Sequence, residues 1–241
     1  MNSEARLTKG ERIAGFIYLP IHMFVFPLFI GLIVVYLAAL LFPERELPSG
    51  ELGDVFFNLI YYAIGFVFCL AAMGKFLRRA FDVLLDNIRS CLVTICSSYM
   101  MMYAMNFVIA MVMLIIMGMD YLVNPNNEFV SELTNTSGGM MVAISVFLGP
   151  MVEEILFRGV LFGSIRQRSR VWAYIVSIAV FGVYHVWQYA FFGWEWWLLL
   201  INAARYIPIG WALARCFDKT GSIWAPIFMH MLNNAIAMII L

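Results

Sequence analysis

Long apolar segments recur along the whole sequence, and they limit the possible folds more than any other feature. A helix needs about 20 mostly apolar residues to cross the hydrocarbon core of a bilayer. Segments of this kind lie at 14–42, 55–74, 91–119, 139–163, 171–192, 196–214 and 222–241. We therefore predict an all-α fold, a polytopic membrane helix bundle with seven transmembrane helices and room for an eighth.

The composition excludes an ordinary soluble globular protein. Hydrophobic residues make up 63% of the 241 residues and charged residues only 12%, whereas soluble domains carry about 25% charged residues. The apolar segments leave no room for a separate soluble domain, so we expect one membrane domain over residues 1–241. The formal net charge is zero, which gives no reason to expect a nucleic acid partner. The expected surroundings are the lipid bilayer.

The charge of the loops alternates and predicts an orientation, because Lys and Arg collect on the cytoplasmic side of membrane proteins. The N-terminus and the segments 75–89, 164–170 and 215–221 are basic, whereas 43–54, 120–138 and 193–195 are mainly acidic. We expect a multi-pass protein of the cell membrane with a cytoplasmic N-terminus and an external C-terminus. The first apolar segment is too long for a signal-peptide core, so we expect it to be retained as a span.

Residues 75–90 have an amphipathic pattern. Apolar side chains recur there at helical spacing, at Leu77, Phe81, Leu84, Leu85 and Ile88. Basic and acidic side chains fill the opposite face of the same helix. The pattern predicts an interfacial amphipathic helix along the inner leaflet. A solvated connector between two spans is the alternative.

The fourth apolar segment contains three charged residues. A charge at the centre of a span costs roughly 2.5–3.5 kcal/mol, so it normally faces a cavity or a partner. Glu154 and Arg158 are four residues apart and can pair on one helix face, which favours a structural role for that pair. Glu153 points to another face and lacks such a partner, which favours a functional role. Pro150 is expected to kink this span.

Two later segments add polar residues at a similar depth. Phe181 and His185 are four residues apart in the fifth segment, as are His230 and Asn234 in the seventh. Counted at about 1.5 Å per residue, these groups and Glu153 lie roughly 12–20 Å from the basic ends of their helices. We predict that they line one hydrated pocket inside the membrane. Taken singly, a histidine or an asparagine in a span can equally be a contact between helices.

These residue types can together hydrolyse a peptide bond. A buried glutamate beside a histidine can hold a water molecule and take its proton. A second histidine, with an asparagine one turn later, can donate to the oxygen that becomes negative when that water attacks a carbonyl. The sequence has no GxSxG or HExxH motif, and its four cysteines lack ligand spacing. Serine, thiol and zincin sites are therefore not indicated.

Three motifs, in this order, resemble those of a known family. EEILFR (residues 153–158), FGVYH (181–185) and HMLNN (230–234) are similar to the EExxxR, FxxxH and HxxxN/D motifs of the CPBP intramembrane proteases. This family of CAAX proteases and bacteriocin-processing (Abi) proteins includes the CAAX prenyl endopeptidases of the Rce type and bacterial self-immunity proteins. The resemblance covers about residues 139–241.

The resemblance implies an intramembrane endopeptidase and a role for each matching residue. Glu153 would act as general base together with His185, and His230 and Asn234 would form the oxyanion site. Glu154 belongs to the candidate catalytic set through its place in the motif. Arg158 and Phe181 would be structural residues of the same motifs.

The resemblance also bears on cofactor and substrate. Members of the family were first described as metalloproteases, and a zinc ion would bind Glu153, His185 and His230 with water in the fourth position. Of the two mechanisms, the resemblance favours the one in which the glutamate acts without a metal ion, so no cofactor is expected. The implied partner is a peptide or a membrane-protein segment, because the short chain resembles bacterial members, which generally have no prenylated substrates.

Two other functions are compatible with the same residues. A membrane bacteriocin-immunity or peptide-binding protein would use the pocket without cleavage, and its function would survive the substitution Glu153→Gln. A small transporter or proton relay would also place Glu and His inside the membrane. Transporters usually contain internal repeats, and none is visible in this sequence.

Overall fold

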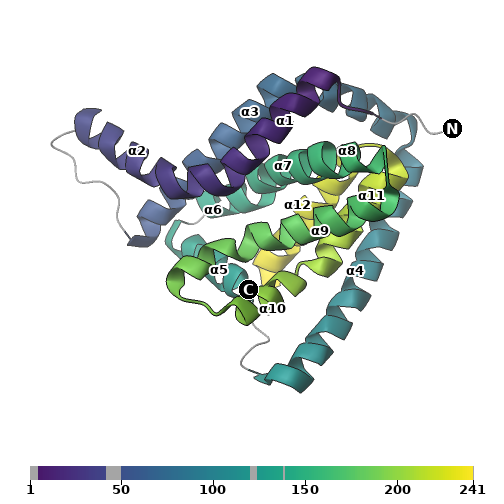
Figure 1. The fold of residues 1–241 in the computed structure, drawn as a ribbon. Coiled ribbons are helices and arrows are strands. Elements are labelled where there is room, and N and C mark those ends of the chain that lie inside the picture. The colour runs from purple at the N-terminus through teal and green to yellow at the C-terminus, as the bar shows by residue number, and fades with distance from the viewer. Residues whose placement is uncertain (1–4, 42–49, 120–123, 138, 241) are drawn as a thin grey trace.

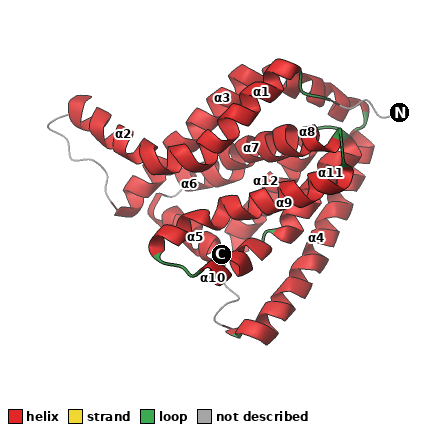
Figure 2. Ribbon diagram, viewed as in Figure 1, coloured by secondary structure: helices red, strands yellow, loops and turns green. Residues whose placement is uncertain are grey.

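Helices account for nearly all of the chain in the computed structural model, which describes residues 5–41, 50–119, 124–137 and 139–240. Within these ranges the helices are joined by short turns, and there is no strand, as Figure 2 shows. The predicted all-α class is confirmed for this part of the chain.

Five helices in the described part of the chain are long and apolar enough to cross a bilayer, namely Lys9–Leu32, Gly50–Asp86, Ile88–Met117, Gly139–Arg166 and Arg170–Phe192. A sixth span results if α10 (Trp196–Ala204) and α11 (Ile207–Thr220) are taken together despite the 44° bend between them. Length and composition thus support five or six of the seven predicted spans. The last predicted span folds as α12 (Trp224–Ile240), which has 17 residues. Its length of about 26 Å is less than the ~30 Å core of a typical bilayer.

The first span runs through α1 (Lys9–Pro20), a π-helical turn (Ile21–Val25) and the first part of α2 (Phe26–Leu41). A capping box fixes its start, because the Thr8 hydroxyl accepts a hydrogen bond from the Glu11 N–H and the Glu11 carboxylate accepts one from the Thr8 N–H. The π-helical turn follows Pro20 directly.

The prediction of a separate interfacial helix at residues 75–90 is wrong. Helix α3 (Gly50–Asp86) continues through most of this segment, and α4 (Ile88–Met117) begins after Asn87. Leu77 and Leu84 are buried within the protein. The Trp224 indole N–H also donates to the Leu77 carbonyl at 2.9 Å. The apolar face that suggested contact with lipid therefore packs partly against other helices. Residues 75–86 continue the helix of the second span.

The span Gly139–Arg166 is the central helix of the bundle. In its most apolar stretch 61% of the residues are buried, against 11–33% in the other four spans. It consists of α6 (Gly139–Ala143), α7 (Gly149–Glu154) and α8 (Gly163–Arg166), joined by π-helical turns at Ile144–Leu148 and Ile155–Phe162. Figure 1 shows α7 and α8 between α1 and α9. A π-helical turn lies on either side of Pro150, and the kink expected at this residue stays a prediction.

The acidic segment after α4 contains a helix that the sequence did not predict. Helix α5 (Pro125–Ser137) packs against α3 and α6. Its buried Leu133 forms an apolar cluster with Val55, Met141 and Ile144. The Thr136 hydroxyl donates to the Glu51 carboxylate. The segment is thus a packed element at the same end of the molecule as the start of α3.

Two helices flank the central helix and carry the predicted histidines. One is α9 (Arg170–Val186), which continues as a 3-10 helix over Trp187–Phe192, and the other is α12. The Ser177 hydroxyl on α9 donates to the Phe157 carbonyl of the central helix at 3.3 Å. Helix α11 packs against α4 and α9.

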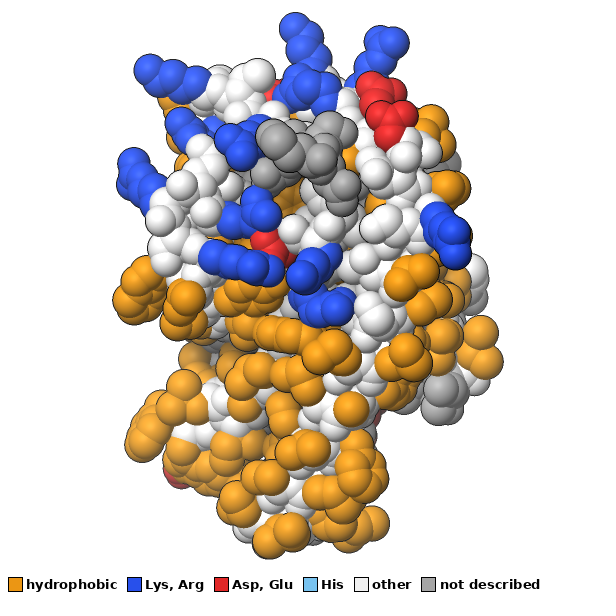
Figure 3. Space-filling view, turned by 90° about the vertical axis from the view of Figure 1, so that its right-hand side faces the viewer, with side chains coloured by type: hydrophobic (Ala, Val, Ile, Leu, Met, Phe, Trp, Pro, Cys, Tyr) orange, Lys and Arg blue, Asp and Glu red, His pale blue; other side chains and the backbone are white. Residues whose placement is uncertain are grey.

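Basic side chains gather at one end of the molecule, where Figure 3 shows Lys and Arg above a broad apolar surface. Four contacts join the basic segments there. Asp218, whose side chain is fully buried, pairs with Arg166 and Arg170. Arg79 donates to the Arg6 carbonyl. The backbone N–H of Ala5 donates to the carbonyl of residue 221. Segments that are far apart in the sequence therefore meet at one basic end.

Candidate active site

The central helix buries three charged side chains side by side. Glu153 is 5% exposed, and Glu154 and Arg158 are fully buried. Arg158 Nη1 lies 2.9 Å from Glu154 Oε1, so these two residues form the expected ion pair. This pairing offsets much of the cost of burying both charges in an apolar medium.

Arg158 is held by two further groups from other helices. Its Nη2 donates to the Gly210 carbonyl of α11 at 3.3 Å. Its guanidinium carbon lies 4.2 Å from the centre of the Phe181 ring, which places the cation over the aromatic face. Arg158 therefore links the central helix to α9 and α11.

His230 on α12 contacts the same carboxylate. Its Nδ1 lies 2.8 Å from Glu154 Oε1. Because an ionised carboxylate only accepts hydrogen bonds, Nδ1 carries a proton in this contact. The opposite ring nitrogen, Nε2, faces Glu153, with 3.9 Å between Nε2 and Glu153 Oε2.

His185 on α9 approaches Glu153 from another side. Its Nδ1 donates to the Phe181 carbonyl at 2.9 Å. In the neutral ring Nε2 is therefore the acceptor. Nε2 lies 3.9 Å from Glu153 Oε2. The imidazole stacks on the Tyr206 ring, with 4.2 Å between ring centres, which fixes its orientation.

Glu153 thus lies between two imidazoles that do not contact it directly. A separation of 3.9 Å is too long for a hydrogen bond, and it is short enough for one water molecule to bridge each pair of atoms. The other carboxylate oxygen, Oε1, accepts a hydrogen bond from the Tyr62 hydroxyl at 2.9 Å. One oxygen of Glu153 is therefore anchored, and the other faces the histidines.

Asn234 lies one turn beyond His230 on α12. Its Nδ2 donates to the Ser145 carbonyl, at the first π-helical turn of the central helix, over 2.9 Å. Its Oδ1 accepts from Asn233 Nδ2 at 3.2 Å. These two contacts fix the orientation of the carboxamide and leave the second N–H of Nδ2 for another acceptor.

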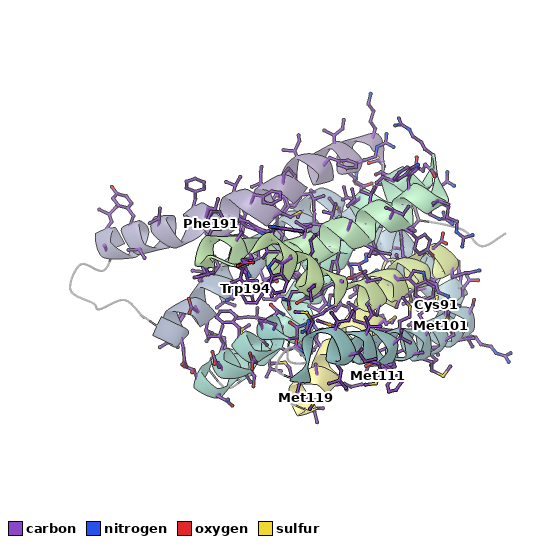
Figure 4. All side chains as sticks on the ribbon, turned by 60° about the horizontal axis from the view of Figure 1, so that its bottom comes forward. Cys91, Met101, Met111, Met119, Phe191 and Trp194 are labelled. Carbon is purple, nitrogen blue, oxygen red and sulfur yellow. The ribbon has the colours of Figure 1, made fainter. Side chains whose placement is uncertain are left out.

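These groups meet at one large cavity. It has a volume of about 1210 Å³, and Glu153, His185, His230 and Asn234 all line it. Glu154 and Arg158 are not among its lining residues and lie behind His230. The C-terminal half of α4 contributes Asn106, Ala110 and Met113 to the cavity wall. Met111 on this helix and Met119 just beyond its end are labelled in Figure 4. Phe191 and Trp194, also labelled there, line its wall beside α9.

The three candidate zinc ligands do not have the spacing of a metal site. Two atoms that bind one tetrahedral zinc ion at about 2.1 Å lie about 3.3–3.4 Å apart. Glu153 Oε2 is 3.9 Å from Nε2 of both His185 and His230. Within the described ranges, no group of three or more His, Cys, Asp or Glu side chains is placed to hold a metal ion. At these separations the three side chains do not form a closed tetrahedral set.

The sequence reasoning missed the aromatic side of the site. Tyr62 on α3 anchors Glu153, and Tyr184, adjacent to His185, lies 3.2 Å from the Tyr62 hydroxyl. The sequence hints at this side of the site only through two consecutive tyrosines, Tyr61 and Tyr62, in the middle of the second apolar segment. Because that segment matches no motif, the sequence does not indicate which group the two hydroxyls contact.

Comparisons with known proteins agree with the motif assignment. Residues 135–236 match the family model described as Type II CAAX prenyl endopeptidase Rce1-like. Over 101 residues the chain is 29% identical to "Putative membrane peptidase YdiL" from Bacillus subtilis (strain 168). The aligned part is 42% of this chain and 36% of that protein, so the chain spans about a third of the length of this curated relative. No solved structure matches the chain.

The matched region includes every site residue predicted from the sequence, and it leaves out Tyr62 and the cavity wall formed by α4. The segments at 153–158, 181–185 and 230–234 all lie within it. Over residues 135–236 the chain is therefore similar to the Rce1-like type II CAAX prenyl endopeptidases.

Proposed function

We propose that this protein is an intramembrane endopeptidase that hydrolyses a peptide bond with water activated by Glu153. The observation that carries the proposal is the position of Glu153 Oε2, which is 3.9 Å from the Nε2 atoms of both His185 and His230. One water molecule at this position can donate to the carboxylate and to an imidazole lone pair. That is the arrangement a general base requires.

In the proposed reaction the water oxygen forms a bond to the substrate carbonyl carbon. The water proton moves to Glu153, and the carbonyl π electrons move to the oxygen. The C–N bond of the tetrahedral intermediate then breaks, and Glu153 returns the proton to the leaving nitrogen. His185, fixed by the Phe181 carbonyl and the Tyr206 ring, holds the water through Nε2.

His230 and Asn234 are the proposed donors to the oxyanion. His230 Nδ1 is bonded to Glu154, so Nε2 donates to the oxyanion only in the doubly protonated form of the ring. Asn234 retains one N–H that is not bonded to the Ser145 carbonyl. Hydrogen bonds to the developing negative charge lower the barrier by several kcal/mol in other acyl-transfer enzymes, roughly 2.7–4 kcal/mol per donor.

The walls of the cavity suit an apolar polypeptide. They include aromatic residues, Phe57, Tyr103, Phe129, Trp187, Phe191 and Trp194. They also include side-chain amides, Asn58, Asn106, Asn124, Asn126, Asn127 and Gln188. Amides both donate to and accept from a peptide backbone. We propose a hydrophobic peptide or a membrane-protein segment as the substrate. We do not assign a prenylated protein or a nucleic acid as partner.

The proposed location is the cell membrane, with the basic end and the N-terminus on the cytoplasmic side. The joining of the basic segments at one end supports this orientation, because Lys and Arg favour the cytoplasmic side. The whole chain of residues 1–241 would then act as one membrane domain, with α12 completing the site.

The experiment that tests the function compares the purified wild type with Glu153→Gln and His230→Ala in liposomes. The probes are internally quenched apolar peptides and one farnesylated peptide ending in a Cys-Ala-Ala-X sequence. We expect cleavage of an apolar peptide by the wild type and a loss of about 10³-fold or more in both variants. Glu128→Gln, at an exposed acidic residue of α5, is the matched control. Cleavage by Glu153→Gln at the control rate would reject the proposal.

The same experiment separates the second candidate, a non-catalytic immunity or peptide-binding protein. The 1210 Å³ cavity favours it as well, because binding alone needs only space and amide contacts. In that case a dansylated apolar peptide binds wild type and Glu153→Gln equally and is cleaved by neither. Binding that persists in Glu153→Gln while cleavage is lost supports the peptidase.

A further inference from the structure

We propose that Tyr184 is a positioning residue for the reaction, that it acts on Glu153 through the hydroxyl of Tyr62, and that Tyr61 competes for its proton. This inference rests on the proposed role of Glu153 as the general base. It adds to the machinery of the site two tyrosines on α3 and Tyr184, which occupies an unspecified position of the FxxxH motif.

A chain of hydroxyl groups leads from the backbone of the first span to Glu153. The Tyr61 hydroxyl donates to the His22 carbonyl at 2.9 Å. The Tyr184 hydroxyl lies 3.2 Å from the hydroxyls of both Tyr61 and Tyr62. The Tyr62 hydroxyl donates to Glu153 Oε1 at 2.9 Å.

The aromatic rings that carry these hydroxyls are held in place. Tyr61 is 5% and Tyr184 is 8% exposed. Tyr61 stacks on His22, with ring centres 4.3 Å apart. Tyr184 packs against Phe157 at 5.1 Å. Because the rings are fixed, the hydroxyl protons are the parts of the chain that can reorient, by rotation about the C–O bonds.

The number of protons is smaller than the number of contacts. Three hydroxyls supply three protons, whereas the chain has four contacts when Glu153 is ionised. The Tyr61 hydroxyl donates its proton to the His22 carbonyl, and the Tyr62 hydroxyl donates its proton to Glu153. The single Tyr184 proton must therefore go to either Tyr61 or Tyr62. These two oxygens compete for it.

The outcome of this competition reaches Glu153. A hydroxyl that accepts one hydrogen bond becomes a stronger donor in the next, because the bonds in a chain polarise one another. When Tyr184 donates to Tyr62, the bond from Tyr62 to Oε1 is strengthened. That bond keeps Oε1 anchored and Oε2 turned toward His185 and His230. When Tyr184 donates to Tyr61, this support is lost.

The test uses four Tyr→Phe variants and the apolar peptide that the wild type cleaves fastest. We expect Tyr184→Phe to lower kcat about two- to tenfold with KM unchanged, and Tyr62→Phe to lower it about tenfold or more. Tyr61→Phe removes the competitor, so we expect it to raise kcat by up to about twofold. A merely structural role predicts that loss of the Tyr61 contacts lowers activity. Tyr99→Phe is the matched control, because Tyr99 makes a 3.2 Å hydroxyl contact with Tyr103 on α4 and does not line the cavity.

A double-mutant cycle tests whether Tyr184 acts through Tyr62. If it does, Tyr184→Phe changes kcat by less than about 1.5-fold when Tyr62→Phe is already present, because the intermediate hydroxyl is gone. Effects that multiply independently, or a Tyr184→Phe variant that behaves like Tyr99→Phe, would overturn the inference.

Infrared difference spectra provide a readout that needs no catalysis. The Glu153 carboxylate band is the one lost in Glu153→Gln. We expect this band to shift in Tyr184→Phe in the same direction as in Tyr62→Phe, and to stay in place in Tyr99→Phe. An unmoved band in Tyr184→Phe overturns the inference even if the enzyme is active. A shifted band without cleavage by the wild type would reject the proposed function and leave the hydroxyl chain standing.

Discussion

His230 and Glu154 are in direct contact, with 2.8 Å between Nδ1 and Oε1, although 76 positions separate them in the sequence. The same carboxylate oxygen accepts from Arg158 Nη1 at 2.9 Å. One buried oxygen thus joins the motif of the central helix to the histidine of α12. In such carboxylate–histidine pairs the carboxylate fixes the proton on the imidazole and the orientation of the ring.

The contact predicts that Glu154 supports catalysis without touching the substrate. We expect Glu154→Gln to lower kcat by about 10²-fold, because a carboxamide accepts a weaker hydrogen bond from His230 Nδ1 and fixes the ring less firmly. KM should stay within about twofold, because Glu154 does not line the cavity. Steady-state kinetics with the best apolar peptide measure both constants. A kcat equal to that of the Glu128→Gln control would contradict this role.

The pair of Glu154 and Arg158 is also expected to determine stability. Arg158→Met leaves the Glu154 charge buried without its main counter-charge, which should reduce the free energy of unfolding by about 3–5 kcal/mol. The double variant Glu154→Gln with Arg158→Met removes both charges and should be more stable than Arg158→Met alone. Unfolding in mixed detergent micelles, followed by tryptophan fluorescence, measures the difference. Arg168→Met, at an exposed residue of the basic end, should be neutral. A double variant less stable than Arg158→Met would argue against the pairing.

The sequence predicted the helical class and most of the motif residues that meet at the cavity, because both depend on short-range patterns. Glu153, His185 and His230 could be grouped because each lies in an apolar segment at a similar depth. Glu154 and Arg158 are four residues apart, so their pairing follows from helix geometry alone.

The remaining features depend on contacts that no local pattern records. Tyr62 reaches Glu153 across 91 positions in the sequence, and a tyrosine in an apolar segment gives no sign of its partner. The continuation of α3 through residues 75–86 depends on protein neighbours such as Trp224. The same amphipathic pattern would suit a membrane surface. The span count differs because α12 is short and α10 and α11 are bent apart.

The proposed orientation in the membrane predicts how two exposed positions react from outside the cell. In a variant without native cysteines, Arg168→Cys should react with a membrane-impermeant maleimide only after the membrane is opened. Glu132→Cys on α5, at the opposite end, should react in intact cells, because Lys and Arg face the cytoplasm. Gel shifts after labelling measure both. The reverse pattern would show an external N-terminus.

The spacing of the site predicts that activity does not depend on a metal ion. The separations of 3.9 Å between Glu153 Oε2 and the two imidazoles exceed those expected for atoms that share one zinc ion. Cleavage should therefore be unchanged after dialysis against EDTA and unchanged by added zinc. Elemental analysis of the purified protein should find well below one zinc per chain. Loss of cleavage that zinc restores would contradict the glutamate mechanism.

The close packing of α9 against α10 at Gly182 is expected to hold His185 in the site. A Cβ atom at this position would lie 2.9 Å from the Ala203 carbonyl oxygen, which belongs to the backbone and cannot rotate away. Gly182→Ala should separate the two helices, destabilise the protein by about 1–3 kcal/mol and move His185. Because small misplacements at a reacting centre are costly, kcat should fall by about tenfold or more.

Gly74→Ala on α3 is the matched control, since a Cβ there meets nothing within 4 Å. It should keep full activity and gain up to about 1 kcal/mol of stability. Thermal unfolding and kcat measure both variants, and equal behaviour of the two would show that the close approach at Gly182 does not position the histidine.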